Sequence, residues 1–225
     1  MKRRRKLPTR RRRALRCAGA ALVLLLLVQN LLHTALLLPI QAVRLKEAQI
    51  GVRDTEVVRR QWEKGTYNGT GLFYLTANEE AVMLCDTVLT FRGWLPVYGA
   101  LLDCGEDAPL HAAQRFLDKV DRPEEGRKTR FYGTHCFFYG RVDDADIETV
   151  EITLPEGTGT GEGPLNAPLF QKDGRRYFLL HCYIPGEDQP DREAGRAAGK
   201  DRAGNTVAEV PMELTGINYD FLSSG

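Results

Sequence analysis

The stretches Ala81-Val-Met-Leu-Cys-Asp-Thr-Val-Leu-Thr-Phe91 and Leu95-Pro-Val-Tyr-Gly-Ala-Leu-Leu-Asp-Cys104 are two apolar runs on either side of Arg92-Gly-Trp94. Two such runs around a short turn predict a β-hairpin. A turn centred on Trp94 and Leu95 would place Cys85 opposite Cys104, close to disulfide reach. Pro96 indicates an edge strand or a bulge, either of which can shift this register by one residue.

Strand patterns continue on both sides of the hairpin. Aromatic or alternating runs predict strands at 71–76, 129–142, 147–154, 175–185 and 210–214. The polar, glycine-rich segments 155–168 and 186–204 predict loops. The exception is 107–120, where Leu110, Ala113, Leu117 and Val120 recur at helical spacing after Pro109. That spacing predicts one amphipathic helix packed on the sheet.

The N-terminal segment predicts a membrane anchor. Residues 2–16 hold ten Lys and Arg, and residues 17–43 hold no Asp, Glu, Lys or Arg. A helix of about 20 apolar residues spans a bilayer, and the positive side of a span lies in the cytoplasm. We therefore expect a basic cytoplasmic tail (1–16), a transmembrane helix acting as a signal-anchor (17–43), a helical stalk (44–65) and an extracytoplasmic domain (66–225). A cleaved signal peptide is the alternative, although the apolar run is longer than the core of such peptides.

The fold class that these patterns predict is α+β. It combines the N-terminal transmembrane helix and short helical stalk with a β-rich antiparallel domain that carries one packed amphipathic helix. The predicted location is the cell membrane, with a single pass, the N-terminus in the cytoplasm and the C-terminal domain outside.

Charge narrows the choice of partners. Residues 65–225 carry 15 Lys and Arg against 26 Asp and Glu, so the predicted domain is acidic. An acidic surface does not favour a polyanion, and the basic tail is typical of a topology signal beside anionic lipid. We expect the lipid bilayer as a partner, with another membrane or envelope protein as a second partner, and no nucleic acid.

The cysteines are the candidate site residues. Four of them, Cys85, Cys104, Cys136 and Cys182, lie in the predicted extracytoplasmic domain, an even number that fits two disulfides. Buried thiols in a core are the alternative. His135-Cys136 and His181-Cys182 repeat one dipeptide within two predicted strands. If those strands pair in register, the cysteines share one face and the histidines the other.

The sequence offers no catalytic centre that we can assign. Its only serines, Ser223 and Ser224, are at the C-terminus, which argues against a serine nucleophile held beside a base. Two His-Cys pairs on opposite faces do not form a four-ligand zinc site. We therefore predict no catalytic residue, no metal site and no cofactor.

Three stretches of the last third of the chain resemble a known kind of protein. These are Tyr139–Leu154, Asp173–Leu180 and Ala198–Val207. Together they resemble the β-rich exported domains of uncharacterised membrane-anchored proteins from Gram-positive bacteria. The resemblance implies a bacterial cell surface and no particular activity.

The leading functional hypothesis is a non-enzymatic binding or accessory module at the cell surface. The alternative is a membrane-anchored enzyme that acts on the envelope through paired carboxylates, whose signature is two carboxylates about 5–10 Å apart in a cleft. A redox role for the cysteines is a third hypothesis.

Overall fold

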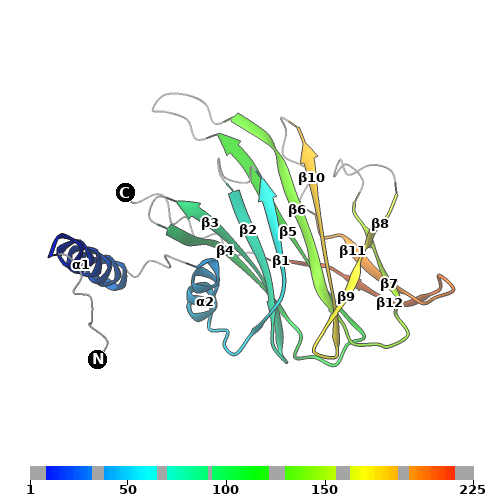
Figure 1. The fold of residues 1–225 in the computed structure, drawn as a ribbon. Helices are drawn as coiled ribbons and strands as arrows, with labels where there is room; N and C mark the ends of the chain where they lie inside the picture. The colour runs from blue at the N-terminus through cyan, green and yellow to red at the C-terminus, as the bar shows by residue number, and fades with distance from the viewer. Residues whose placement is uncertain are drawn as a thin grey trace.

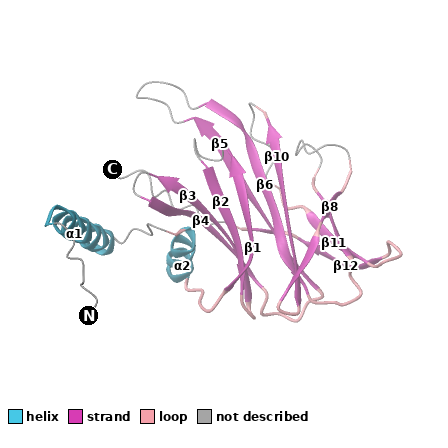
Figure 2. Ribbon diagram, viewed as in Figure 1, coloured by secondary structure: helices cyan, strands magenta, loops and turns pink. Residues whose placement is uncertain are grey.

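The structure is a computed structural model that describes residues 9–31, 38–64, 70–90, 93–121, 130–155, 163–186 and 193–215. Two helices, α1 (Thr9–Leu31) and α2 (Pro39–Ile50), precede a domain built of strands. Figure 1 shows α1 apart from the strands and α2 against them. The strands form three sheets, which are drawn in magenta in Figure 2.

The first sheet, sheet A, contains the predicted hairpin. Its strand order follows the chain, and every pair is antiparallel: β1 (Glu56–Lys64), β2 (Thr70–Ala77), β3 (Ala81–Thr90) and β4 (Gly93–Asp103). The hairpin prediction is confirmed by the β3–β4 pair.

The other two sheets share the remainder of the chain. Sheet B has the order β13 (Glu213–Leu214), β5 (Leu110–Asp121), β6 (Arg130–Val142), β10 (Arg175–Pro185) and β9 (Leu169–Lys172). Sheet C has the order β12 (Thr206–Pro211), β11 (Arg196–Lys200), β7 (Thr149–Thr153) and β8 (Leu165–Ala167). Only the short β13–β5 pair is parallel among the described strands.

Sheet B is the middle layer, because apolar side chains cover both of its faces. Phe137 and Tyr139 of β6 point into one core with Phe73 and Leu84 of sheet A. The alternate residues of β6, such as Phe138, pack into a second core against sheet C. Alternation along one strand thus supplies both cores.

Helix α2 covers the outer face of sheet A. Ala42 and Val43 are fully buried in a third cluster with sheet-A side chains that include Leu72 and Trp94. Close approach needs a glycine on the sheet, since a Cβ added at Gly99 would lie 2.8 Å from Lys46 Cγ and 2.9 Å from Ile50 Cδ1. The described layers are therefore α2, sheet A, sheet B and sheet C.

The prediction of an N-terminal transmembrane helix is wrong. No helix among the described residues is both long and apolar enough to cross a membrane. The apolar run of 17–43 is interrupted at Leu38, whose backbone is extended, and α2 begins at Pro39, a residue suited to a first helical position. The end of the run, Ala42 and Val43, is buried against sheet A.

Two other helical predictions also fail. The stalk of 44–65 is not one helix, since α2 ends at Ile50, Gly51 adopts a positive φ of 81°, and β1 begins at Glu56. The amphipathic helix at 107–120 is strand β5. Because β5 lies in the middle layer, Ala112 and Phe116 face sheet C while Ala113 and Leu117 face sheet A. Burial on both faces removes the alternation that identifies a half-buried strand.

The described loops also differ from the predicted ones. Strand β8 lies within the predicted loop 155–168, and β11 lies within the predicted loop 186–204. The strands predicted at 71–76, 129–142, 147–154 and 175–185 correspond to β2, β6, β7 and β10.

Candidate functional site

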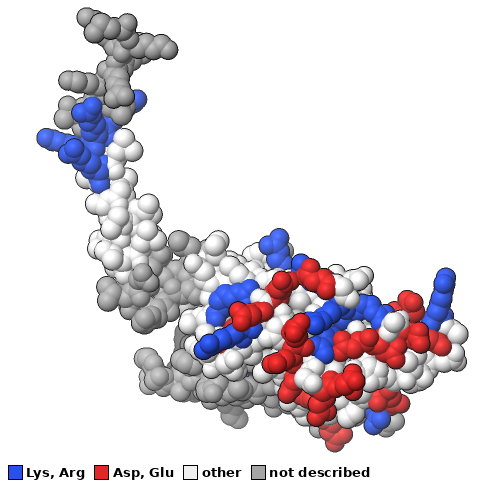
Figure 3. Space-filling model, turned by 90° about the horizontal axis from the view of Figure 1, so that it is seen from below, with Lys and Arg blue, Asp and Glu red and all other residues white. Residues whose placement is uncertain are grey.

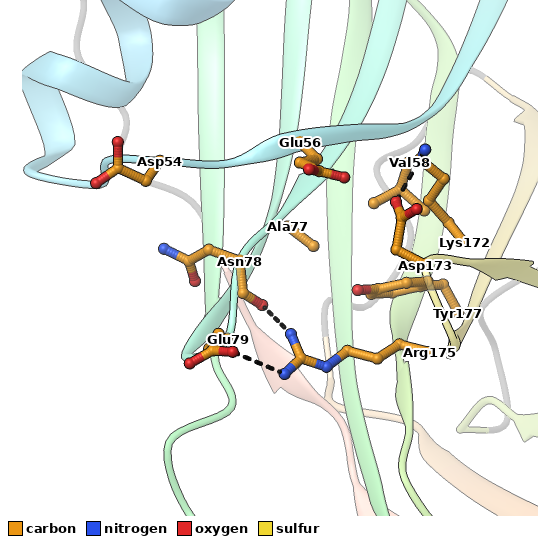
Figure 4. A pocket seen from close by; sticks show the side chains of 10 residues that line it. All are labelled: Asp54, Glu56, Val58, Ala77, Asn78, Glu79, Lys172, Asp173, Arg175 and Tyr177. Atoms are coloured by element: carbon orange, nitrogen blue, oxygen red, sulfur yellow. Dashed lines mark hydrogen bonds and ion pairs between the residues drawn. The ribbon is translucent and has the colours of Figure 1, made fainter.

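A pocket of about 230 Å³ lies where sheet A meets the β9–β10 hairpin. The segment before β1, the β2–β3 turn and the β9–β10 turn surround it (Figure 4). Its ten lining residues are Asp54, Glu56, Val58, Ala77, Asn78, Glu79, Lys172, Asp173, Arg175 and Tyr177.

Local sequence fixes the two turns that shape this pocket. Asp173 and Gly174 form the two-residue turn between β9 and β10, with φ values of 50° and 81°. An Asp-Gly pair suits such a turn, because both residues tolerate positive φ. In the β2–β3 turn, Asn78 Oδ1 accepts hydrogen bonds from the amides of Glu80 and Ala81, at 3.0 and 2.8 Å. The side-chain amide of Asn78 also donates to the carbonyl of Arg53, at 2.9 Å, and so ties the segment before β1 to this turn.

A cation–π contact joins the edges of sheets A and B beside the pocket. The guanidinium carbon of Arg59 on β1 lies 4.8 Å from the ring centroid of Phe170 on β9. A cation over an aromatic face is attracted to it. This contact joins the edge of sheet A to the edge of sheet B.

The charged groups of the pocket are unevenly paired. Lys172 forms an ion pair with Asp173 at 2.8 Å, and Arg175 forms one with Glu79 at 3.4 Å. Among the described residues, no lysine or arginine forms an ion pair with Asp54 or Glu56. Four carboxylates therefore share two cations.

Asp173 is the carboxylate of this pocket whose ionised form its neighbours stabilise. Its hydrogen bond from Lys172 lowers its pKa, and a hydrogen bond with the carboxyl group of Glu56 lowers it further. Asp173 therefore stays ionised at neutral pH. Two carboxyl groups this close disfavour a second negative charge unless a cation lies beside them.

The inner side of the pocket is less polar than its rim. Ala77 and Tyr177 are each only 4% exposed, and Val58 packs against the same core. Burial raises the pKa of the Tyr177 phenol, so it is neutral. The pocket thus combines an apolar wall with a rim of excess negative charge.

This arrangement suits an organic cation better than a metal ion. No group of three His, Cys, Asp or Glu side chains in the described ranges is arranged to hold a metal. An ammonium or guanidinium group on an apolar stem can place its charge at the rim and its methylenes on the wall.

The predicted Cys85–Cys104 pairing is wrong. Cys85 pairs with Gly99, because Thr90 pairs with Gly93 and a bulge falls between Asp86 and Thr87. Cys85 also faces the α2 side of sheet A, whereas Cys104 faces sheet B. The sheet therefore separates the two thiols.

The second pair of cysteines has the predicted register. Cys136 and Cys182 are direct partners on β6 and β10. They lie on the sheet-C face, and both are free thiols. A disulfide between them stays a prediction.

The two histidines share the opposite face of these strands. His135 Nδ1 lies 2.9 Å from His181 Nε2, and their rings stack. Burial lowers the pKa of His135 to about 4, with smaller effects of His181 and Lys119. His135 is therefore neutral at physiological pH.

Sequence reasoning missed the pocket for one local reason. The turn at Lys172–Arg175 was predicted, but Glu56 was assigned to a helical stalk instead of a sheet edge. The charged, alternating run that begins at Glu56 was the only signal available for a strand there.

We compared the chain with protein families, curated proteins and solved structures, and no match was found in any of the three. The resemblance of the last third to exported bacterial domains therefore stays a prediction.

Proposed function

We propose that this protein is a non-enzymatic binding module whose pocket takes a cationic group of its partner. The partner class is a protein that presents a lysine or arginine side chain. The observation that carries the proposal is the close approach of the Glu56 and Asp173 carboxyl groups at a rim with too few cations.

The neighbouring charges support this choice of ligand. Lys172 pairs with Asp173 and is attracted more weakly by Glu56, and Arg175 is occupied by Glu79 and by the carbonyl of Asn78. Asp54 and Glu56 are exposed, so an incoming cation can reach both. A bound ammonium would relieve the repulsion between Glu56 and Asp173 and gain a charge-assisted hydrogen bond.

The alternative, an enzyme with paired carboxylates, would use these same two groups. Such an enzyme holds its two carboxyl groups about 5–10 Å apart, on either side of the scissile bond. Asp173 and Glu56 are instead within hydrogen-bonding reach of each other. This close approach favours binding over catalysis.

The test is titration calorimetry of the full chain with N-acetyl-lysine methylamide. The uncharged N-acetyl-norleucine analogue serves as the ligand control. Loss of one charge-assisted contact costs more than about 1.4 kcal/mol, so we expect Glu56→Gln to weaken binding about tenfold or more. Glu106→Gln, which changes an exposed acid outside the pocket, should leave the affinity unchanged. Equal binding of the lysine and norleucine probes, or equal loss in both variants, would overturn the proposal.

The location at the cell surface also stays a prediction. Protease added to intact cells tests it, because an exposed domain is cleaved and a protected one is not.

A further inference from the structure

An apolar patch lies on the outer face of sheet A, at the edge of the part that α2 covers. Trp62 on β1 is 58% exposed, and its ring centroid lies 5.9 Å from that of Trp94 on β4, in an edge-on arrangement. Leu89 on β3, 54% exposed, is the direct partner of Trp94. We call Trp62, Leu89 and Trp94 the tryptophan patch.

The patch continues the face on which α2 packs. Trp62 pairs with Leu72, and Leu72 lies in the cluster that holds Ala42 and Val43 of α2. Trp94 belongs to that cluster as well. Two large exposed apolar side chains beside a covered face are unusual on a soluble domain and indicate a contact surface.

One basic side chain, Arg60, lies on the face of the patch, and exposed acids gather at the opposite end of the strands. Arg60 pairs with Tyr74 and so shares the face of Trp62. The β2–β3, β4–β5, β6–β7 and β9–β10 turns all lie at the other end of the strands (Figure 1). They carry the exposed acids Glu79, Glu80, Glu106, Asp143 and Asp173. Figure 3, which views the molecule from below, shows acidic side chains gathered on this face together with basic ones.

The segments that precede sheet A, Leu38 and α1, also expose apolar and basic side chains. Leu38, just before α2, is exposed. Helix α1 is basic at Arg10–Arg13 and exposes the apolar run Leu22–Val28, as the blue and white parts of the helix in Figure 3 show. Indole rings with arginines nearby are typical of the headgroup level of an anionic lipid surface.

We propose that the tryptophan patch docks on the surface of a bilayer that contains anionic lipid. Trp62 and Leu89 enter the headgroup region, and Arg60 pairs with lipid phosphate. The acidic end then points away from the bilayer, so the pocket at Glu56 and Asp173 is presented to partners. This inference is independent of what the pocket binds.

The test uses the two tryptophans of the chain: Trp62 is exposed and reports contact with lipid, whereas Trp94 is only 8% exposed and supplies a constant background emission. The full chain is diluted from detergent into vesicles of phosphatidylglycerol and phosphatidylcholine in equal parts. We expect a blue shift of the tryptophan emission and its quenching by brominated lipid. Because α1 contains no tryptophan, binding through α1 alone would sediment the chain with vesicles and leave the emission unchanged. That outcome would overturn the proposal.

A pair of matched variants makes the test specific. Leu89→Glu keeps both tryptophans and should reduce brominated-lipid quenching at least threefold. Val207→Glu places the same charge at an exposed position on β12 of sheet C and should leave the quenching unchanged. Circular dichroism verifies that both variants are folded. Equal quenching in Leu89→Glu and the parent chain would contradict docking on lipid. So would a blue shift of the tryptophan emission that vesicles do not produce and that a second protein does.

Discussion

Cys136 on β6 lies directly opposite Cys182 on β10, on the face of sheet B that packs against sheet C. Directly opposed residues of an antiparallel pair have Cα atoms about 4.5–5.5 Å apart, which is within the range that a disulfide bridges. The Cys136 thiol donates a hydrogen bond that lowers the pKa of Cys182, and a thiolate is the nucleophile in disulfide exchange.

We predict that oxidised glutathione converts these two thiols into an intramolecular disulfide. The Cys182 thiolate attacks glutathione disulfide and releases one glutathione, and Cys136 then displaces the second. The closed loop should stabilise the fold by roughly 4 kcal/mol in the chain-entropy account. Peptide mass spectrometry without reduction, together with urea unfolding, measures both effects. Cys85 and Cys104 provide the internal control, because sheet A separates them and they should remain unlinked to each other.

The buried His135 predicts a dependence of stability on pH. Its pKa of about 4 lies below the usual value of 6.5, so the folded state favours the neutral ring. The unfolded chain therefore binds more protons between these two values. This contribution is complete above pH 6.5 and is lost as the pH falls towards 4, by up to about 3 kcal/mol.

Urea unfolding at several pH values, with His135→Gln as the comparison, measures this contribution. The difference in unfolding free energy between the parent chain and the variant should shrink as the pH falls from 7 to 4. A difference that does not change with pH would show that His135 is not held neutral by the fold.

Two glycines should respond differently to alanine. A Cβ at Gly140 would lie 1.9 Å from the backbone oxygen of His111, whereas the three atoms nearest to a Cβ at Gly99 all belong to the side chains of Lys46 and Ile50. Backbone in the middle of sheet B cannot move aside as a side chain can. Gly140→Ala should therefore lower the unfolding free energy by about 3 kcal/mol or more, and Gly99→Ala by about 1 kcal/mol. Denaturant unfolding of the two variants measures which substitution lowers the unfolding free energy more. A larger loss for Gly99→Ala than for Gly140→Ala would contradict this account.

Much of the β architecture follows from patterns that the sequence displays. The hairpin at 81–104 and the register of the two His-Cys dipeptides were predicted correctly, because alternation and a short turn are local properties. The Cys85–Cys104 register failed mainly because the hairpin closes between Thr90 and Gly93 instead of around Trp94 and Leu95, and the bulge after Asp86 changes the register by only one residue.

The other errors come from tertiary context. Leu110, Ala113 and Leu117 have helical spacing, yet they belong to a strand with a core on each face. Ala42 and Val43 were assigned to lipid, and sheet A buries them instead. The pocket could not be predicted, because Glu56 and Asp173 meet only when sheets A and B are assembled.

The position of sheet B between two cores has a consequence for synthesis on the ribosome. Sheet A, which ends at Asp103, is complete while β5, β6 and β10 are still to be made. Its inner side chains, Phe73, Leu75, Leu84 and Leu102, have no cover until the strand ending at Pro185 arrives. A nascent chain of this protein therefore exposes one apolar face of sheet A while residues 104–185 are being made, which is the kind of surface that chaperones recognise.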